Sequence, residues 1–380
     1  MTSRSIHWRS CVLLVLLAVV VVGCQSLSPD PATPHHDGNK FNNPHSHDPH
    51  GPQGWYALPD FLKWRWERLT GGAPEPDDDA YQVTLAHNDP AYLKSNGEDP
   101  TLTWIGHSTL LLQLHGVNIL TDPHLTERAS PVSWAGSKRL VPPGLDFEDL
   151  PEIHVVIISH SHYDHLDLPT LQRLSQQWGP ERSPRIFVPL GIKAYLDSKG
   201  IPNVIEMDWW DQERYKGLSI HAVPAQHYSR RTPFDGNRTL WAGFAVISDD
   251  FRFLFVGDSG YSPDFEEIGE RFGPFDLAAI PIGHYAPRWY VKAMHVNPEE
   301  AVLVHRDVRA RCSVAIHWGT FPLPGDDPLD EPPKRLRAAL LEAGISQRDF
   351  SVMQHGETRH LHTDTCEPEP RNIATHTNDN

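Results

Sequence analysis

The feature that most constrains the fold is a dense group of metal-binding side chains at the end of an apolar strand. Residues 154–160 read HVVIISH, a short apolar run of the kind that forms a buried strand. The overlapping stretch SHSHYDHLD carries four potential ligands within six positions: His160, His162, Asp164 and His165. Zinc, iron and manganese all accept imidazole and carboxylate ligands. We therefore expect a metal site where this strand ends.

Three further ligand-type residues each follow a strand-like apolar run. His227 ends HAVPAQH, Asp258 follows FRFLFVG and His317 follows RCSVAI. Taken singly, each residue fits a polar strand cap as well as a metal ligand. Together with the first cluster, they favour one site assembled from the ends of several strands.

The order of predicted elements indicates sheets covered by helices. TLTWIGH, TLLLQLH and VNILTD, between 101 and 122, are typical of short strands, and further strands are predicted near 218–223, 240–247, 251–256 and 276–283. Helices are predicted over 166–178, 297–310 and 333–343, the first with Asp167 and the second with Asn297 as N-cap. This mixture predicts sheet layers with helices packed on them.

The N-terminus is typical of a secretory signal. Arg4 and Arg9 precede an apolar run at 12–22, which is shorter than the roughly 20 residues that span a membrane. The following VVGC resembles the bacterial lipobox, which predicts a signal peptide over 1–23 and lipidation of Cys24; an ordinary signal with an incidental Cys is the alternative. Gln25 after the Cys fits sorting to the outer membrane. We expect a lipid-anchored envelope protein facing the periplasm.

The remaining chain divides by composition. Residues 24–54 are polar and predict a solvated tether, although five His there (His35, His36, His45, His47 and His50) leave weak metal scavenging open. Residues 55–100 form a Trp-rich extension whose first part, 55–69, interleaves aromatic and basic residues. That part fits a membrane interface and packing on the domain equally well. A folded domain that contains the ligand-type residues is predicted over 101–363 and a polar tail over 364–380.

Charge argues against a protein that binds nucleic acid through its overall charge, and cysteine content argues against a fold built on disulfides. The 33 Lys and Arg against 49 Asp and Glu leave a net charge of −16, so the chain has no overall basic surface for nucleic acid. Only 4 Cys are present, and Cys312 lies in an apolar run while Cys366 lies in the polar tail. From this we predict no structural disulfide.

The pattern H-x-H-x-D-H with a later His, Asp and His resembles the metallo-β-lactamase superfamily, over about residues 100 to 360. The resemblance implies an α+β fold, the four-layer αβ/βα sandwich. It implies that one divalent ion is held by His160, His162 and His227. Asp164, His165 and His317 would hold a second ion, and Asp258 would bridge the two. Zinc is the expected metal, with iron and manganese left open.

Longer stretches resemble one branch of that superfamily, the N-acyl-phosphatidylethanolamine-hydrolysing phospholipases D. They include TWIGHSTLL, LTDPHL, PAQHYSRRT, GDSGY, AIHWGTF and, near the N-terminus, KFNNP at 40–44. The resemblance implies hydrolysis of a phospholipid to phosphatidic acid and N-acylethanolamine by hydroxide activated between two metals. It also implies a homodimer. Two residues depart from the pattern, His284 where a small residue is expected and Met294 where a polar one is expected.

Several other residues have two interpretations. His295 is the candidate catalytic residue, behind the metal ligands or in contact with phosphate, but a buried structural His beside Asn297 fits equally. For His107 we favour a structural hydrogen bond, and for His305 a surface or packing role. Trp289 and Tyr290 fit aromatic core better than an acyl-chain cavity.

Three classes of function remain after these arguments. The first is a membrane-anchored phosphodiesterase acting on phospholipids. The second is another hydrolase on the same scaffold: a lactonase, a β-lactamase or a nuclease. A bridging Asp favours phosphodiesterases and lactonases, and the acidic charge disfavours a nuclease. The third is a metal-storing or scaffolding lipoprotein, which seven ligands speak against because structural zinc sites close with about four.

Overall fold

The computed structural model describes residues 35–45, 62, 63, 66, 83–322, 327–361 and 366. The predicted signal peptide, Cys24 and most of 55–82 lie outside the described residues. Within the described part of the chain, no helix is both long and apolar enough to cross a membrane.

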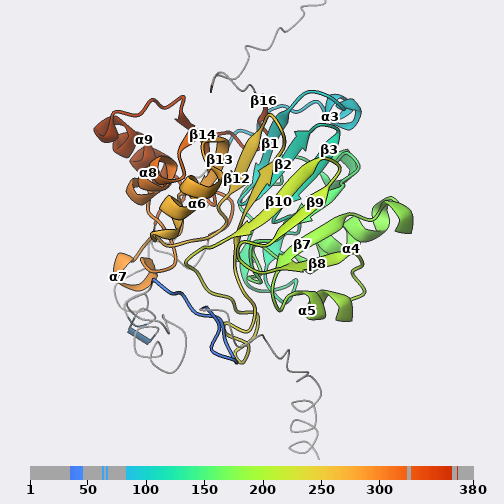
Figure 1. Cartoon of the computed structure of the whole chain (residues 1–380), viewed down its shortest axis with the longest axis horizontal. Coiled ribbons are helices and arrows are strands. Elements are labelled where there is room, and N and C mark those ends of the chain that lie inside the picture. The colour runs from blue at the N-terminus through green and yellow to red at the C-terminus, as the bar shows by residue number, and fades with distance from the viewer. Residues whose placement is uncertain are drawn as a thin grey trace, which may run out of the picture.

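Two seven-stranded sheets form the centre of the molecule (Figure 1). The first has the order β16 (Thr358–His360), β1 (Thr101–Gly106), β2 (Thr109–Leu114), β3 (Val117–Thr121), β6 (Val155–Ile157), β7 (Arg185–Pro189) and β8 (Val204–Met207). The second has the order β15 (Phe350–Ser351), β14 (Ala310–Ile316), β13 (Phe275–Pro281), β12 (Arg252–Phe255), β11 (Gly243–Ile247), β10 (Leu218–Val223) and β9 (Gln212–Tyr215). A short ribbon joins β4 (Arg128–Ala129) to β5 (Ser137–Lys138).

The two sheets repeat one topology. In the first, β1, β2 and β3 pair antiparallel, and β3, β6, β7 and β8 pair parallel. In the second, β9 to β12 pair antiparallel, and β12 to β15 pair parallel. The C-terminal strand β16 crosses to the first sheet and pairs antiparallel with β1. The chain therefore contains two similar halves, closed by one crossing strand.

Helices cover the outer face of each sheet (Figure 1). From residue 83 onward, the α-helices of the described residues are α3 (Pro90–Ser95), α4 (Leu168–Gln177), α5 (Lys193–Ser198), α6 (Asp264–Phe272), α7 (Arg288–Val291), α8 (Pro298–Asp307) and α9 (Glu331–Ala343). Leu111 packs with α4 and α5 residues, while its neighbours Leu110 and Leu112 face the layer between the sheets. The second sheet likewise packs Leu254 towards α6, α8 and α9, and Phe253 and Phe255 inward.

This alternation buries both faces of each sheet, because successive strand residues point to opposite sides. The result is four layers in the order helix, sheet, sheet, helix. The predicted α+β, αβ/βα sandwich is confirmed.

The predicted start of the helix at 297 is the start of α8. The Asn297 side chain accepts a hydrogen bond from the Glu300 N–H at 2.8 Å, and the Glu300 carboxylate accepts one from the Asn297 N–H at 3.3 Å. This capping box satisfies two main-chain donors that a helix leaves free.

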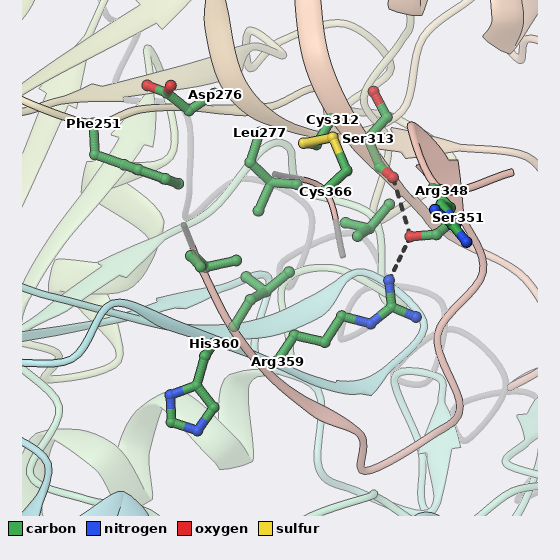
Figure 2. Close-up of a pocket in the computed structure, with 13 residues that line it drawn as sticks. Phe251, Asp276, Leu277, Cys312, Ser313, Arg348, Ser351, Arg359, His360 and Cys366 are labelled. Atoms are coloured by element: carbon green, nitrogen blue, oxygen red, sulfur yellow. Dashed lines mark hydrogen bonds between the residues drawn. A yellow bond between two sulfur atoms is a disulfide. The ribbon is translucent and has the colours of Figure 1, made fainter. Parts of the chain in front are cut away.

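The prediction of no structural disulfide is wrong. Cys312 of β14 is bonded to Cys366, with the two Cα atoms 5.6 Å apart although 54 positions separate them in sequence. Figure 2 shows the bond beside Leu277 and Ser313, above Arg359. The sequence placed one cysteine in an apolar strand and the other in a polar tail, which gave no reason to pair them. In the fold, β16 brings the chain back past the sheet that contains β14. The pairing is a consequence of that return path.

Part of the predicted tether packs on the domain. Phe41 is 4% exposed and joins the core between the sheets, and His35 contacts Asp208 at 2.7 Å. The main-chain N–H of Phe41 donates to Asn237 O. This differs from a solvated linker over the whole of 24–54, because a buried aromatic side chain together with polar contacts to the domain holds residues 35–45. The domain boundaries themselves stay predictions.

Asn297→Ala should lower the free energy of unfolding by about 1 kcal/mol, because it removes the cap of α8. The measurement is chemical or thermal denaturation of the purified chain. Asn297→Asp keeps an acceptor oxygen and should stay close to the parent protein. Equal stability of the Ala variant and the parent would contradict this role for the cap.

Candidate metal centre

The candidate ligands come from the same edge of both sheets. His107 follows β1 and His160 follows β6, at the ends where these two strands point in the same direction. His227, Asp258 and His317 follow β10, β12 and β14, which also run in one direction. The sheets face each other, so their strand ends bring these side chains into one cluster.

The first group is three imidazoles. One nitrogen each of His160, His162 and His227 lies within 4.8 Å of the others. His160 Nε2 lies 2.7 Å from His162 Nδ1, and His227 Nε2 lies 3.3 Å from the same atom. This is the set that the resemblance assigned to the first ion.

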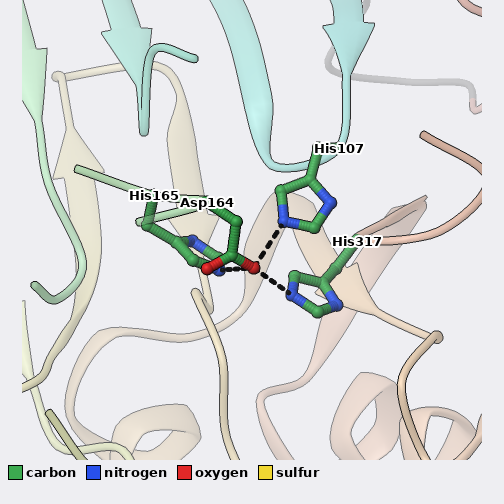
Figure 3. Close-up of side chains that lie close together, drawn as sticks. All are labelled: His107, Asp164, His165 and His317. Carbon is green, nitrogen blue, oxygen red and sulfur yellow. Dashed lines mark hydrogen bonds and ion pairs between the residues drawn. The ribbon is translucent and has the colours of Figure 1, made fainter. Parts of the chain in front are cut away.

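The second group surrounds the Asp164 carboxylate (Figure 3). Its Oδ2 lies 3.1 Å from His107 Nε2, 3.4 Å from His165 Nε2 and 3.7 Å from His317 Nε2. The predicted residues Asp164, His165 and His317 are therefore together, and His107 joins them. The hydrogen bond expected for His107 exists, and its partner is the predicted ligand Asp164 itself.

Asp258 lies between the two groups. Its Oδ2 is 3.0 Å from His317 Nε2 and 3.2 Å from His165 Nε2 in the second group. The same oxygen is 3.8 Å from His227 Nε2 in the first. The structure thus brings together all seven residues predicted as ligands, with Asp258 between the two groups, and its bridging of two metals stays a prediction.

The donor atoms fit divalent cations. Asp258 Oδ1 is buried and makes no hydrogen bond within the described residues, and His165 Nε2 and His317 Nε2 face carboxylates without making one. Buried polar atoms of this kind are costly unless something binds them. Imidazole nitrogens and carboxylate oxygens are the donors that zinc, iron and manganese accept.

Electrostatics keep most of these groups in the form that binds a metal. Burial lowers the pKa of His160 and His162 well below the ordinary value, and lowers the pKa of His227 to about 4. Burial alone would raise the pKa of Asp258, but His165 and His317 hold that pKa well below its usual range. At neutral pH these three imidazoles are unprotonated and the carboxylate is ionised.

Two histidines behave in the opposite way. Burial acts to lower the pKa of His317, but Asp258 and Asp164 outweigh it and raise the pKa to about 9. Burial is likewise outweighed at His165, whose pKa is raised well above normal by Asp258, Asp164 and Asp122. Metal binding at these two residues must therefore displace protons at neutral pH.

A carboxylate behind the ligands fixes His165. Asp122 Oδ2 lies 2.7 Å from His165 Nδ1, and its Oδ1 accepts from the Ser159 N–H at 2.7 Å. Partners of this kind orient a ligating imidazole and set which nitrogen faces the metal. Sequence reasoning missed Asp122, although it ends the apolar run VNILTD in the same way that the ligands end theirs.

His295 lies beside the centre. Its Nδ1 is 3.9 Å from Asp258 Oδ2, is buried and has no hydrogen-bond partner among the described residues. Its ring contacts those of His227 and His284, with centroids 5.0 and 4.5 Å away. This nitrogen is thus free to contact a molecule bound at the centre, and the catalytic role of His295 stays a prediction.

The remaining residues considered in the sequence analysis have different roles in the structure. His305 is buried with its Nδ1 2.8 Å from Ser313 Oγ, a packing role away from the centre. The Met294 carbonyl lies 2.9 Å from His227 Nδ1, so this departure from the family pattern contributes through its main chain. The core interpretation of Trp289 is wrong, because the side chain is 45% exposed on α7 with Lys63 Nζ 4.1 Å above its ring.

The family is shown by comparison with known proteins. A model described as "Beta-lactamase superfamily domain" matches residues 117–318, more than half of the chain. The chain belongs to the metallo-β-lactamase superfamily. It is 44% identical over 263 residues to N-acyl-phosphatidylethanolamine-hydrolyzing phospholipase D 1 of Caenorhabditis elegans. The aligned region covers 66% of this chain and 72% of the relative.

Other relatives are matched over less of their length. A mitochondrial N-acyl-phosphatidylethanolamine-hydrolyzing phospholipase D of Saccharomyces cerevisiae is 36% identical over 65% of this chain and 53% of its own. An uncharacterized protein of Mycobacterium tuberculosis is 44% identical over 63% of each chain. Within the superfamily, these matches place this chain close to the phospholipases D.

Solved structures support the fold. Igni18, a metallo hydrolase from Ignicoccus hospitalis, aligns with a TM-score of 0.51 and 24% identity over 70% of this chain and 99% of its own. An isothiocyanate hydrolase from Delia radicum gut bacteria aligns with a TM-score of 0.53 and 23% identity over 69% and 99%. These two likenesses support the fold, while the family model, the relatives and the cluster of His and Asp ligands together show a metal-dependent hydrolase of this superfamily.

Asp122→Asn should weaken binding of Co²⁺ by about 10- to 100-fold, because His165 loses the carboxylate that orients it. Chelator competition followed by cobalt absorption measures the affinity. Asp250→Asn is the matched control, since Asp250 also lies 2.7 Å from a His, but in an exposed pair between turns. Equal affinities in the two variants would contradict the role of Asp122.

Proposed function

We propose that this protein is a phosphodiesterase of the phospholipase D type that hydrolyses N-acyl-phosphatidylethanolamine-like phospholipids. The observation that carries the proposal is the Asp258 carboxylate, which lies between two groups of ligand atoms. Such a carboxylate suits a pair of ions acting on one oxygen, as in two-metal phosphodiester hydrolysis. The similarity to two phospholipases D supports the substrate class.

The residues have separate tasks in this proposal. His160, His162 and His227 would hold one ion and Asp164, His165 and His317 the other, both most simply zinc. Such ions, when bound, supply a water of lowered pKa and stabilise charge on the attacked phosphoryl group. Asp122 and the Met294 carbonyl orient the imidazoles of His165 and His227.

His295 would contact the substrate phosphate. Its Nδ1 is buried next to the bridging Asp258 and is not committed to a protein partner among the described residues. Burial, with His284 next in effect, lowers its pKa well below normal. The ring is therefore neutral at pH 7, with one nitrogen available as a donor or acceptor.

The alternative is another hydrolase of the superfamily, above all a lactonase. A bridging carboxylate suits lactones as well as phosphodiesters, so the metal centre alone does not separate the two. His284, whose ring lies beside His295, is a bulky residue at the edge of the site. The assay below distinguishes the two classes of substrate.

The full-length chain in mixed micelles should release phosphatidic acid and N-acylethanolamine from N-acyl-phosphatidylethanolamine, and a chelator should abolish the reaction. Asp258→Asn should lower the rate by at least about 100-fold, since a ligand matters no less than its supporting residues. Asp250→Asn, on the surface, should leave it unchanged. Turnover of lactones without any phospholipid turnover would reject the substrate and keep the hydrolase.

We also propose that the protein works on a membrane. Large apolar side chains are exposed on three segments: Trp134 (80%), Phe234 (85%) and Trp289 (45%). The Phe234 loop is tied to the site through Arg231, which donates to the carbonyls of Ser161 and Leu166. Exposed aromatic side chains favour a bilayer interface. Lipidated Cys24 and the 55–69 segment would add to this attachment at the outer membrane, and a homodimer stays a prediction.

Cys24→Ser should move the chain from the membrane to the soluble fraction, because stable anchoring needs acyl chains and the aromatic contacts alone are reversible. Cell fractionation with a high-salt wash, followed by immunoblotting, measures the distribution. Cys11→Ser, in the same leader, is the control and should remain in the membrane fraction. Retention of the Cys24→Ser chain after washing would reject lipidation as the anchor.

A further inference from the structure

The segment 35–45 crosses the molecule beside the metal centre. Figure 1 shows it in blue at the lower edge, on the side of α7. It begins at His35, whose ring contacts that of Trp209 at a tilt of 30°, with centroids 4.3 Å apart. It is fixed in the middle by buried Phe41 and ends at His45, which contacts Asp264 at 3.2 Å. We call residues 35–45 the strap.

The strap makes its closest approach to the site through Asn43. The Asn43 side-chain oxygen accepts a hydrogen bond from the His227 main-chain N–H at 3.1 Å. The amide nitrogen of the same side chain donates to the His227 carbonyl at 2.8 Å. One side chain therefore pairs with both main-chain groups of a single residue, as a neighbouring strand would.

His227 needs such a partner because the sheet no longer provides one. Strand β10 ends at Val223. Between that strand and His227, an isolated antiparallel β-bridge pairs Gln226 with Gly260. His227 is completely buried, and among the described residues Asn43 is the partner of both its N–H and its carbonyl. A buried main-chain group without a partner costs roughly 1–3 kcal/mol, so these two bonds matter to the local conformation.

The His227 imidazole is fixed at its other end by the Met294 carbonyl, 2.9 Å from Nδ1. That contact sets the ring rotation and leaves Nε2 facing His162 and Asp258. Asn43 holds the main chain from which the side chain extends. The two contacts together fix both ends of one predicted metal ligand, and one of them comes from outside the hydrolase domain.

We propose that Asn43 is a positioning residue for the metal centre, which it serves by holding the main chain of His227. The strap is then part of the active site, and a domain that begins at residue 101 is incomplete without it. This inference rests on the proposed metal-dependent function, because it assigns His227 to the centre. It adds a contribution from a segment that precedes the catalytic domain by more than 50 positions.

Asn43→Ala and Asn42→Ala in the full-length chain test the proposal, with Co²⁺ as the probe. Asn42 is the matched control, because it directly precedes Asn43 and its main-chain N–H, not its side chain, donates a hydrogen bond to His35 O. Asn43→Ala should weaken binding of Co²⁺ by about 10-fold in chelator competition, the lower end of the range for residues behind a ligand. It should also shift the visible absorption bands of the bound cobalt. Asn42→Ala should match the parent in both.

The outcomes separate this inference from the proposed function. Thermal unfolding of each apo variant checks that the chain folds. A lower melting temperature for Asn43→Ala, with unchanged cobalt affinity and spectrum, would show a merely structural strap and overturn the proposal. Parental affinity at unchanged stability would overturn it as well. A parent chain that binds no cobalt at all would reject the metal-dependent function itself, whatever the variants do.

Discussion

The structure depends on keeping two carboxylates buried beside a dense group of imidazoles. Asp258 is 4% exposed, and Asp164 is also largely enclosed. An ionised group in such a place is stable only if opposite charge or hydrogen bonds compensate it. His165 and His317 provide that charge, with Asp258 and Asp164 raising the pKa of His317 to about 9 against the effect of burial. Divalent ions would provide it more fully, which is why the same arrangement suits catalysis.

That requirement explains how the layers are used. Five strands end at one edge of two facing sheets, and each end delivers one or more polar side chains while the strand itself is apolar. The rigid apolar layers fix the positions of the ligands, and the loops after the strands supply their chemistry. Supporting groups then come from further away: Asp122 behind His165, the Met294 carbonyl beside His227, and Asn43 on the His227 main chain. Each of them limits the motion of an imidazole that a metal needs in one orientation.

Sequence patterns were informative where local chemistry and position coincide. The HVVIISH run predicted a strand end and SHSHYDHLD predicted ligands. Both lie where expected, because a short continuous apolar run and a loop full of ligand types are local properties. Trp289 was expected in the core and is exposed, since hydrophobicity alone does not distinguish an aromatic side chain that packs from one that faces solvent. The Cys312–Cys366 bond and the docked strap were missed for another reason. Both are contacts between segments far apart in sequence, and no local pattern, KFNNP included, indicates which residues they meet.

The sequence by itself determined the seven ligand-type residues at or just after strand ends, because short local motifs contain them, and those motifs carry the family resemblance that implies the four-layer fold. Only the tertiary structure showed that the grouped side chains lie within contact distance, and that His107 and Asp122 join them. The physical reason is that a metal centre requires atoms within a few ångströms of each other, and that proximity comes from the stacking of two sheets. The same stacking places an N-terminal asparagine on the main chain of His227, a contact that only the folded chain contains.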